Sequence, residues 1–379
     1  MESLINIFSE LEDPRDNRGK KHELIHVIVL AIYGILCGYT DFTNMAYFLK
    51  KNEDKLSKEL NLLNGIPSHD TFSFVFRLIN PDTFMKLFIR WTKQVVEKKS
   101  LNNSHIAIDG KAIKSATDKV NNGNIPYIVS AFLTEAGISI GQVKVNDKSN
   151  EITAIPDLLD LIDIKDSTIT IDAIGSQRQI VEKIIDKQGN YCLSVKENQR
   201  ALHNDIKNYF DAFIDDKEEL QRINTYETVE KSHGRIETRK YYISDNLYYI
   251  NDADKWKDLS AIGMVIQTRE EKGTVSKETH YYILNKFIDA SKFGEYVRKH
   301  WSIENNLHWV LDVIFDEDHS TAKKDSAIQN LATIRKIAFN LTKLDPLMKD
   351  KTTKKKIIDY TFDFDNFKRL IYDVIPNNN

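Results

Sequence analysis

The sequence is poor in cysteine and glycine, and it has no long uninterrupted apolar run. Its 379 residues include two cysteines, Cys37 and Cys192. Both lie in apolar runs, so we expect buried thiols in a reducing compartment and no disulfide between them. The 14 glycines fall below the usual share of about 7%, which argues against a glycine-rich loop fold. The longest apolar run, residues 24–37, is shorter than the roughly 18 residues of a membrane span and is interpreted as a buried core helix.

A large excess of charge of one sign is also missing. The 53 basic and 56 acidic residues leave a net charge of −3. This balance argues against a uniformly basic nucleic-acid coat, but local basic clusters could still bind DNA. Residues 1–11 carry acids where a secretory signal needs a basic start. We therefore expect a soluble, cytoplasmic protein without a membrane partner.

Three patterns follow one another along the chain, whose length is typical of two or three domains. Residues 1–100 keep helical spacing and are predicted to form an all-helical N-terminal domain. Residues 101–345 mix β-branched runs with helical segments, which predicts an α/β (α+β) domain with a mixed sheet and a β-rich insertion at about 219–288. Residues 346–379 are predicted to form a basic C-terminal tail with a short helix.

Short β-branched runs bounded by polar turns mark the predicted strands. They lie at residues 105–109, 125–133, 138–145, 168–172 and 191–195, and in the insertion around 225–229, 238–243, 261–267 and 279–284. Residues 134–137, Thr-Glu-Ala-Gly, are typical of a hairpin turn. Helices are predicted at residues 152–162 and 177–187, and the helical pattern returns from 290 to 344.

Two predicted strands end in the same way, with an aspartate after a β-branched run. These residues are Asp109, after Ile106-Ala-Ile, and Asp172, after Ile169-Thr-Ile. A carboxylate at the end of a buried strand is costly unless it is paired or binds a cation. If the two strands are neighbours, the two oxygen ligands could converge on Mg²⁺. The alternative is that each aspartate caps the following turn or helix; a single aspartate favours the cap, whereas the matched pair favours the metal.

A third carboxylate is expected from the late helices. Glu304 lies on the edge of an apolar stripe, and it is spaced i, i+4, i+8 with His300 and His308, so the three are predicted to share one helix face. The alternative is a solvated glutamate on an amphipathic helix with histidines at the core edge. Asp312 and Glu317 are the next candidates for a third carboxylate.

Several short motifs, in their joint order, resemble the DDE-class insertion-sequence transposases, specifically the group of H-repeat-associated proteins. Any one of these motifs is weak, but the resemblance runs over nearly the whole chain. The motifs are Asp13-Pro-Arg15, Gly19 to His22, Pro67 to Thr71, Asp109-Gly-Lys111, Asp147 to Pro156, Asp172-Ala173, Leu193 to Gln199, His233 to Arg239 and Trp301 to Asp312.

The resemblance implies an RNase H-like catalytic core in which Asp109, Asp172 and Glu304 bind two Mg²⁺ ions, with Mn²⁺ as a possible substitute. It implies a metal-dependent endonuclease and strand transferase that cleaves phosphodiester bonds at insertion-sequence ends and joins the 3′-hydroxyl to target DNA. The implied partners are double-stranded terminal inverted repeats and target DNA, and the protein is expected to act as a homodimer on DNA ends, associated with the bacterial nucleoid.

This sequence departs from the pattern of wider relatives at three positions, and it also offers candidate DNA contacts. Wider relatives place Tyr, Arg and Lys around the glutamate, where this chain has Val297, His300 and Leu311; Arg298 and His308 are the expected stand-ins. The N-terminal domain is expected to bind DNA ends. For any single lysine, the alternative is a solvated surface residue. The predicted DNA-contacting residues are Arg15, Arg18, Lys20, Lys21, Lys111, Lys114, Lys196, Asn198, Gln199, Lys231, His233, Arg235, Arg239, Arg298 and His308.

Two other functions remain as alternatives. The first is a catalytically inactive, DNA-binding relic of a mobile element, although all three carboxylates are present. The second is a zinc metalloprotease, because His22-Glu23-Leu-Ile-His26 fits the His-Glu-x-x-His signature. That pattern is short, and no third histidine follows at the expected place.

Overall fold

Segments that lie far apart in the sequence come together in two units. The first unit comprises residues 1–101, 110–150 and 304–379, and the second comprises residues 102–109 and 151–303. Strand β1 (His105–Ala112) passes from the second unit into the first after Asp109. The computed structural model describes residues 2–18, 20–101, 103–114, 125–145, 151–213, 223–232, 234–320, 322, 324 and 326–372.

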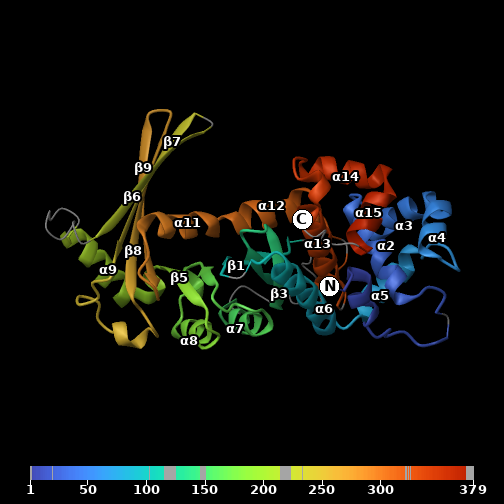
Figure 1. Cartoon of the computed structure of the whole chain (residues 1–379), viewed down its shortest axis with the longest axis horizontal. Helices are drawn as coiled ribbons and strands as arrows, with labels where there is room; N and C mark the ends of the chain where they lie inside the picture. The colour runs from blue at the N-terminus through green and yellow to red at the C-terminus, as the bar shows by residue number, and fades with distance from the viewer. Residues whose placement is uncertain are drawn as a thin grey trace. The chain divides into compact units, whose positions relative to one another are not determined.

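The first unit is mainly helical, and residues 1–100 form helices as predicted (Figure 1). Helix α2 is buried along almost its whole length, which confirms the interpretation of the longest apolar run. Ser68 and Asn80 cap α5 and α6, and Pro81 occupies the first turn of α6, where its missing N–H costs nothing. The helices are α1 (Leu4–Ser9), α2 (Leu24–Leu36), α3 (Phe42–Lys51), α4 (Glu53–Leu60), α5 (His69–Leu78), α6 (Pro81–Lys98), α12 (Trp309–Val313), α13 (Ala327–Leu344), α14 (Thr353–Phe362) and α15 (Phe364–Tyr372).

Helix α13 holds the first unit together although it carries polar residues. It packs on α2, α5 and α6 and on strand β3. Its Asn330 is fully buried, and Nδ2 donates to the carbonyl oxygens of Phe76 and Ile79, each at 2.9 Å, at the end of α5. These bonds satisfy carbonyl groups that the last turn of a helix leaves without an intrahelical partner.

Strands β2 (Tyr127–Leu133) and β3 (Ile138–Val145) form an antiparallel hairpin in the first unit. Leu133 pairs with Ile138, and Gly137 has a φ of 65°, which a glycine adopts without steric cost. The hairpin that Thr-Glu-Ala-Gly predicts is therefore confirmed.

The second unit contains a mixed sheet, as the sequence predicts. Its strands are β1, β4 (Thr168–Ile171), β5 (Asn190–Val195), β6 (Asn224–Ser232), β7 (Arg235–Ser244), β8 (Ala261–Glu271) and β9 (Thr274–Leu284), in the spatial order β1-β4-β5-β9-β8-β7-β6. The pairs β1–β4 and β4–β5 are parallel and the others are antiparallel. The helices of this unit are α7 (Glu151–Leu161), α8 (Arg178–Asp186), α9 (Arg200–Phe213) and α11 (Ala290–His300).

The core beneath α11 fixes that helix to the insertion strands. Phe293 and Val297 of α11 belong to one buried cluster with Tyr241, Ile243 and Val265. A side chain at Gly294 would meet the Tyr241 ring at 3.1 Å, so the glycine allows close approach of helix and strand. Figure 1 shows the long ribbons β6 to β9, which continue beyond this core.

Two parts of the second unit differ from the sequence prediction. Strands β8 and β9 reach Glu271 and start at Thr274, so both are longer than predicted. The outer end of β9 is exposed and that of β8 is mostly half-buried, so this part of the ribbon has no buried apolar face for a sequence pattern to detect. Helix α9, Arg200–Phe213, was not predicted.

The predicted return of helical structure between residues 290 and 344 is confirmed, in several separate segments. Helix α11 ends at His300, and a π-helix, Glu304–His308, and the short α12 precede α13. Of the helices that the structure describes, none combines the length and the apolar character that crossing a membrane requires. Cys37 and Cys192 are buried free thiols, as predicted, and burial raises the pKa of both, that of Cys37 to about 12.

We predict that Asn340→Ala destabilises the protein. Asn340 is fully buried; its Oδ1 accepts from the backbone N–H of Ser139 at 2.9 Å, and its Nδ2 donates to the Ser139 carbonyl at 2.7 Å. Because each buried group left without a partner costs about 1–3 kcal/mol, the free energy of unfolding in urea should fall by roughly 2–5 kcal/mol. Gln329→Ala, at a half-buried position of the same helix, is the control. Equal losses for both variants would contradict the expectation.

Candidate active site

The paired strands β1 and β4 bring two predicted ligands to matching positions. Ile108 pairs with Ile171 in the parallel register, so Asp109 and Asp172 follow at the same end of the paired segment. Asp172 directly follows β4, but β1 continues to Ala112, so the predicted strand end at Asp109 is wrong. Both are partly exposed, whereas the strand residues before them are buried. The predicted adjacency of these two strands is therefore confirmed.

Asp172 also caps the turn that follows it. Its Oδ1 accepts from the N–H of Ile174 at 3.1 Å, at the start of the 3₁₀ turn Ala173–Gly175. The capping interpretation thus holds for this residue. It does not compete with ligand binding, because a carboxylate has two oxygens and about four acceptor sites.

Two predicted DNA contacts brace the turn after Asp172 instead of standing free of the protein. Asn198 Nδ2 donates to the Ala173 carbonyl at 2.6 Å, and Gln199 Nε2 donates to the Ser176 carbonyl at 2.9 Å. Lys196, just before them, is exposed. The segment after β5 therefore fixes the backbone beside Asp172 and presents one cation to solvent.

A buried polar chain lies behind Asp172, and sequence reasoning missed most of it. Thr170 Oγ1 is 2.7 Å from His105 Nε2 and 3.0 Å from His300 Nδ1. Burial lowers the pKa of His300 to about 4, although Asp172 opposes the shift, and burial lowers that of His105 to about 3. Both rings are therefore neutral at pH 7. By the resemblance, His300 stands where wider relatives have an arginine, and a neutral imidazole does not supply that positive charge.

Glu304 is the first residue of the π-helix and is exposed. His308 is only 8% exposed, so it does not share an exposed face with Glu304. Helix α11 ends at His300, and the predicted shared face with that residue stays a prediction. Ile303 and Leu307 are buried, as expected, whereas Trp301 is 53% exposed and does not anchor the segment.

The three predicted ligands are not all in one unit. Asp109 and Asp172 belong to the second unit, and Glu304 belongs to the first. Among the residues that the structure describes, no group of three or more His, Cys, Asp or Glu side chains is arranged to hold a metal ion. The role of Glu304 as the third ligand stays a prediction.

Lys111, predicted to contact DNA, lies among carboxylates of the first unit. Its Nζ is ion-paired with Asp312, is 2.7 Å from Glu317 Oε2 and is 3.7 Å from Asp318 Oδ1. Burial alone would raise the pKa of Glu317, but Lys111, Lys336 and Arg335 outweigh it and lower the pKa to about 2. Asp312 and Glu317, the alternative third ligands, are thus engaged by a lysine.

The arginines predicted to bind DNA around the insertion form ion pairs within the second unit. Arg235 Nε is 3.0 Å from Glu237, and Arg239 and Arg298 share Glu230 at 3.3 and 2.7 Å. The Arg298–Glu230 pair is exposed on both sides, and such pairs are worth about 0–1 kcal/mol, so a phosphate could replace that carboxylate. Glu237 is buried and Arg239 is 14% exposed. His233 lies outside the residues that the structure describes.

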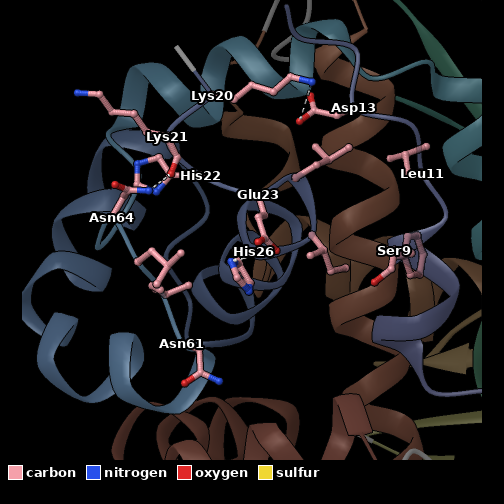
Figure 2. A pocket seen from close by; sticks show the side chains of 15 residues that line it. Ser9, Leu11, Asp13, Lys20, Lys21, His22, Glu23, His26, Asn61 and Asn64 are labelled. Carbon is pink, nitrogen blue, oxygen red and sulfur yellow. Dashed lines mark hydrogen bonds and ion pairs between the residues drawn. The ribbon is translucent and has the colours of Figure 1, made fainter. Parts of the chain in front are cut away.

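A pocket of about 430 Å³ lies in the first unit, around the start of α2 (Figure 2). His22, Glu23 and His26 line it, but α2 begins only at Leu24. The two histidines therefore do not lie four residues apart on one helix, as the zinc-protease signature requires. His26 Nδ1 is 3.8 Å from Glu23 Oε2, and the geometry gives the metalloprotease alternative no support.

Basic residues stand on one side of this pocket. Lys20 and Lys21 line it, Lys20 Nζ is 3.7 Å from Asp13, and Lys21 is exposed. Arg15, another predicted DNA contact, is held instead by Asp13 at 2.8 Å and by the His22 carbonyl at 2.6 Å. Lys20 and Lys21 are therefore better placed than Arg15 to meet a phosphate.

Comparison with known proteins matches nearly the whole chain. The DDE_Tnp_1-associated model matches residues 5–92, and the Transposase DDE domain model matches residues 101–341. YncI of Escherichia coli O157:H7, named as a transposase, is 37% identical over 345 residues, 90% of this chain and 87% of that protein. YhhI of Escherichia coli K12, named as an H repeat-associated transposase, is 34% identical over 94% of each chain.

Among solved structures, a piggyBac transposase synaptic complex with hairpin DNA matches 99% of this chain and 81% of its own, with a TM-score of 0.40 and 12% identity. The family models and the relatives confirm the resemblance to H-repeat-associated transposases and the RNase H-like α/β fold class.

We predict that Glu317→Gln changes how stability depends on pH. The pKa of Glu317 is about 2 in the folded protein and about 4.5 for an ordinary glutamate, so its charge stabilises the fold above about pH 4.5, and this stabilisation is lost as the pH falls toward 2. Breaking a buried pair costs about 3–5 kcal/mol, so wild type should exceed the variant by that order at pH 6. The difference should shrink between about pH 4.5 and 3.

Urea unfolding at several pH values measures this difference directly. Glu97→Gln, at an exposed position of α6, is the matched control and should track wild type throughout. A gap between wild type and Glu317→Gln that stays constant down to pH 3 would mean that Glu317 is not ionised by its neighbours.

Proposed function

This chain belongs to the DDE transposase family, and from that premise we propose that it cleaves phosphodiester bonds at the ends of an insertion sequence and joins the freed 3′-hydroxyl to target DNA. The observation that carries the proposal is the parallel register of β1 and β4, in which Asp109 and Asp172 follow paired isoleucines at one end of the paired segment. A transposase of this family needs acidic ligands side by side at such a position.

The donor set fits a hard divalent cation. Asp109 and Asp172 offer carboxylate oxygens, which Mg²⁺ prefers, and Asp172 spends Oδ1 on one backbone N–H, which leaves its other oxygen. Two Mg²⁺ ions, for which Mn²⁺ can substitute, would supply Lewis acidity at the attacking and leaving oxygens of the phosphodiester. Asp109, Asp172 and Glu304 are the residues that would hold them.

The assignment of Glu304 as the third ligand rests on its motif and on its local structure. It stands in the Trp301 to Asp312 motif that resembles the family's third acidic segment. It is exposed at the start of a π-helix while Ile303 and Leu307 on either side are buried. Short π segments often occur at functional sites, because they displace a side chain from the regular helical face.

The neighbouring residues define what surrounds the scissile phosphate. Asn198 and Gln199 keep the backbone after Asp172 in place, and the exposed Lys196 can neutralise a phosphate beside it. His300 stays neutral and orients Thr170 behind the strand end. Phosphate contacts of this kind position DNA without reading its sequence.

The insertion and the N-terminal helices would hold the rest of the DNA. Arg235, Arg239 and Arg298 are the candidates in the insertion and α11, and Arg298 is the best placed because its exposed partner Glu230 can be exchanged for a phosphate. We propose terminal inverted repeats and target DNA as the double-stranded partners and a homodimer as the active form on DNA ends, in the cytoplasm. The inactive-relic alternative predicts DNA binding without cleavage.

We predict that Glu304→Gln abolishes cleavage but preserves DNA binding. The amide keeps the shape of the side chain and removes one negative ligand, so several kcal/mol of transition-state stabilisation should be lost, or about 10²–10⁴-fold in rate. Single-turnover cleavage of a labelled repeat end in Mg²⁺, beside a gel shift on the same preparation, measures both properties.

The control for that experiment is Glu97→Gln, which should cleave like wild type. Removing the metal with EDTA should stop wild-type cleavage, and Mn²⁺ should restore it. Normal cleavage by Glu304→Gln would remove it from the ligand set. Wild type that binds repeat ends but never nicks them in either metal would instead favour the inactive relic.

We predict that replacing Lys20 and Lys21 together with alanine weakens binding of repeat-end DNA. Every lysine–phosphate pair that is removed should reduce the slope of log affinity against log salt by about 0.9, so the double variant should bind more weakly and respond less steeply to salt. Titrations at several salt concentrations measure both effects. The pair Lys50→Ala and Lys51→Ala, on α3, is the matched control; an equal weakening there would mean that only total charge matters.

A further inference from the structure

The ammonium group of Lys111 connects two stretches of the first unit that are distant in sequence. Lys111 lies in β1, two residues after Asp109, and its partners Asp312, Glu317 and Asp318 all follow Glu304. The Lys111–Glu317 bond spans 206 positions of the chain. One side chain therefore links the strand of the first proposed ligand to the segment of the third.

The segment after Glu304 needs such a link because its own backbone structure is short. The π-helix has 5 residues, α12 has 5 and the 3₁₀ turn Glu317–His319 has 3. Helical segments of this length are not stable by themselves, and tertiary contacts decide their position. Buried Leu307, Leu311 and Phe315 supply apolar contacts, but such contacts are non-directional.

The partners of Lys111 are themselves fixed from the other side. Glu317 is 1% exposed and faces Arg335 and Lys336 of α13 in addition to Lys111. Lys336 Nζ in turn donates to Gln142 of β3. The charged cluster therefore joins β1, α13 and β3 around the segment that begins at Glu304.

The burial of Lys111 separates it from a DNA-binding lysine. Its side chain is 11% exposed and lies among three carboxylates, whereas the side chain of Lys114 is 75% exposed and its Nζ is 3.2 Å from Asp318 Oδ2. A buried ammonium that a duplex cannot reach is poorly suited to binding a phosphate. Lys86, which is exposed on α6 of the same unit, serves as the lysine control.

We propose that Lys111 is a positioning residue. Its ion pairs with Asp312 and Glu317 hold residues 304–320, the Glu304 segment, to the part of β1 that follows Asp109. The proposal rests on the proposed function for its catalytic consequence, but the attachment of the segment is a property of the protein alone. Lys111 touches neither metal nor DNA in this role; it acts through the position of Glu304.

The test compares Lys111→Met, Lys111→Arg and Lys86→Met in the full-length chain. Hydrogen exchange of residues 304–320, without DNA or metal, reports the attachment. Lys111→Met should speed exchange there and leave α2 protected. Single-turnover cleavage at saturating repeat-end DNA should fall about 100-fold, because a displacement of about 1 Å can cost that much, while the Kd for DNA stays unchanged. Lys86→Met should match wild type in exchange and cleavage.

Lys111→Arg separates a positioning charge from a mere packing role. The guanidinium keeps the charge and can bind carboxylates through two N–H groups, so it should restore protection of residues 304–320 and most of the cleavage rate. Methionine fills similar space without the charge, so equal behaviour of the two variants would overturn the proposal.

The remaining outcomes are distinct. A weaker Kd with a normal saturating rate for Lys111→Met would assign Lys111 to DNA binding and overturn the proposal. Unchanged exchange in Lys111→Met would overturn it as well, whatever the cleavage rate. If wild type never cleaves DNA, the proposed function fails, and the exchange measurement still decides whether Lys111 holds the segment.

Discussion

The site depends first on the parallel pairing of β1 with β4. Four consecutive residue pairs, from His105–Thr168 to Ile108–Ile171, set which residues follow the paired segment. A slip of one residue would turn the side chains of one strand to the opposite face and separate the two aspartates. The bond between His105 and Thr170 opposes this slip, because it fixes one strand against the other by a buried polar contact. This contact of His105 thus helps to keep Asp109 and Asp172 at matching positions of the two strands.

Basic side chains serve two purposes here, and their exposure separates them. The Lys111 side chain is 11% exposed and is proposed to hold the segment after Glu304. Lys196, which directly follows β5, is exposed. Arg298 lies between these cases, because it is 40% exposed and its partner Glu230 is also accessible. Since the chain is close to neutral overall, DNA binding would depend on local clusters of basic side chains. It would also depend on ion pairs in which a phosphate can replace the carboxylate.

Local signals made much of the fold predictable. The strand end before Asp172 and the hairpin at residues 134–137 each depend on a few neighbouring residues, and both were found from the sequence. The predicted strand end at Asp109 is wrong, because β1 continues to Ala112. The Lys111 cluster was not found, because its partners lie about 200 positions away and a lysine after an aspartate gives no local sign of them. The π-helix was also missed, since its apolar spacing still resembles an α-helix over so few residues. The third ligand remains a prediction for the same reason: its place depends on contacts between distant segments.

Because its two cysteines are buried, this protein can be labelled selectively at an introduced, exposed cysteine. Both thiols are shielded from solvent, and burial keeps them protonated at neutral pH, while thiol-directed reagents react with the thiolate. A single cysteine introduced at an exposed position would therefore be the fast-reacting thiol of an otherwise native chain. Fluorescent or spin labels could be placed on strands β6 to β9 or near Glu304 without first replacing Cys37 or Cys192. The buried core would then stay unaltered while the label reports DNA binding in real time.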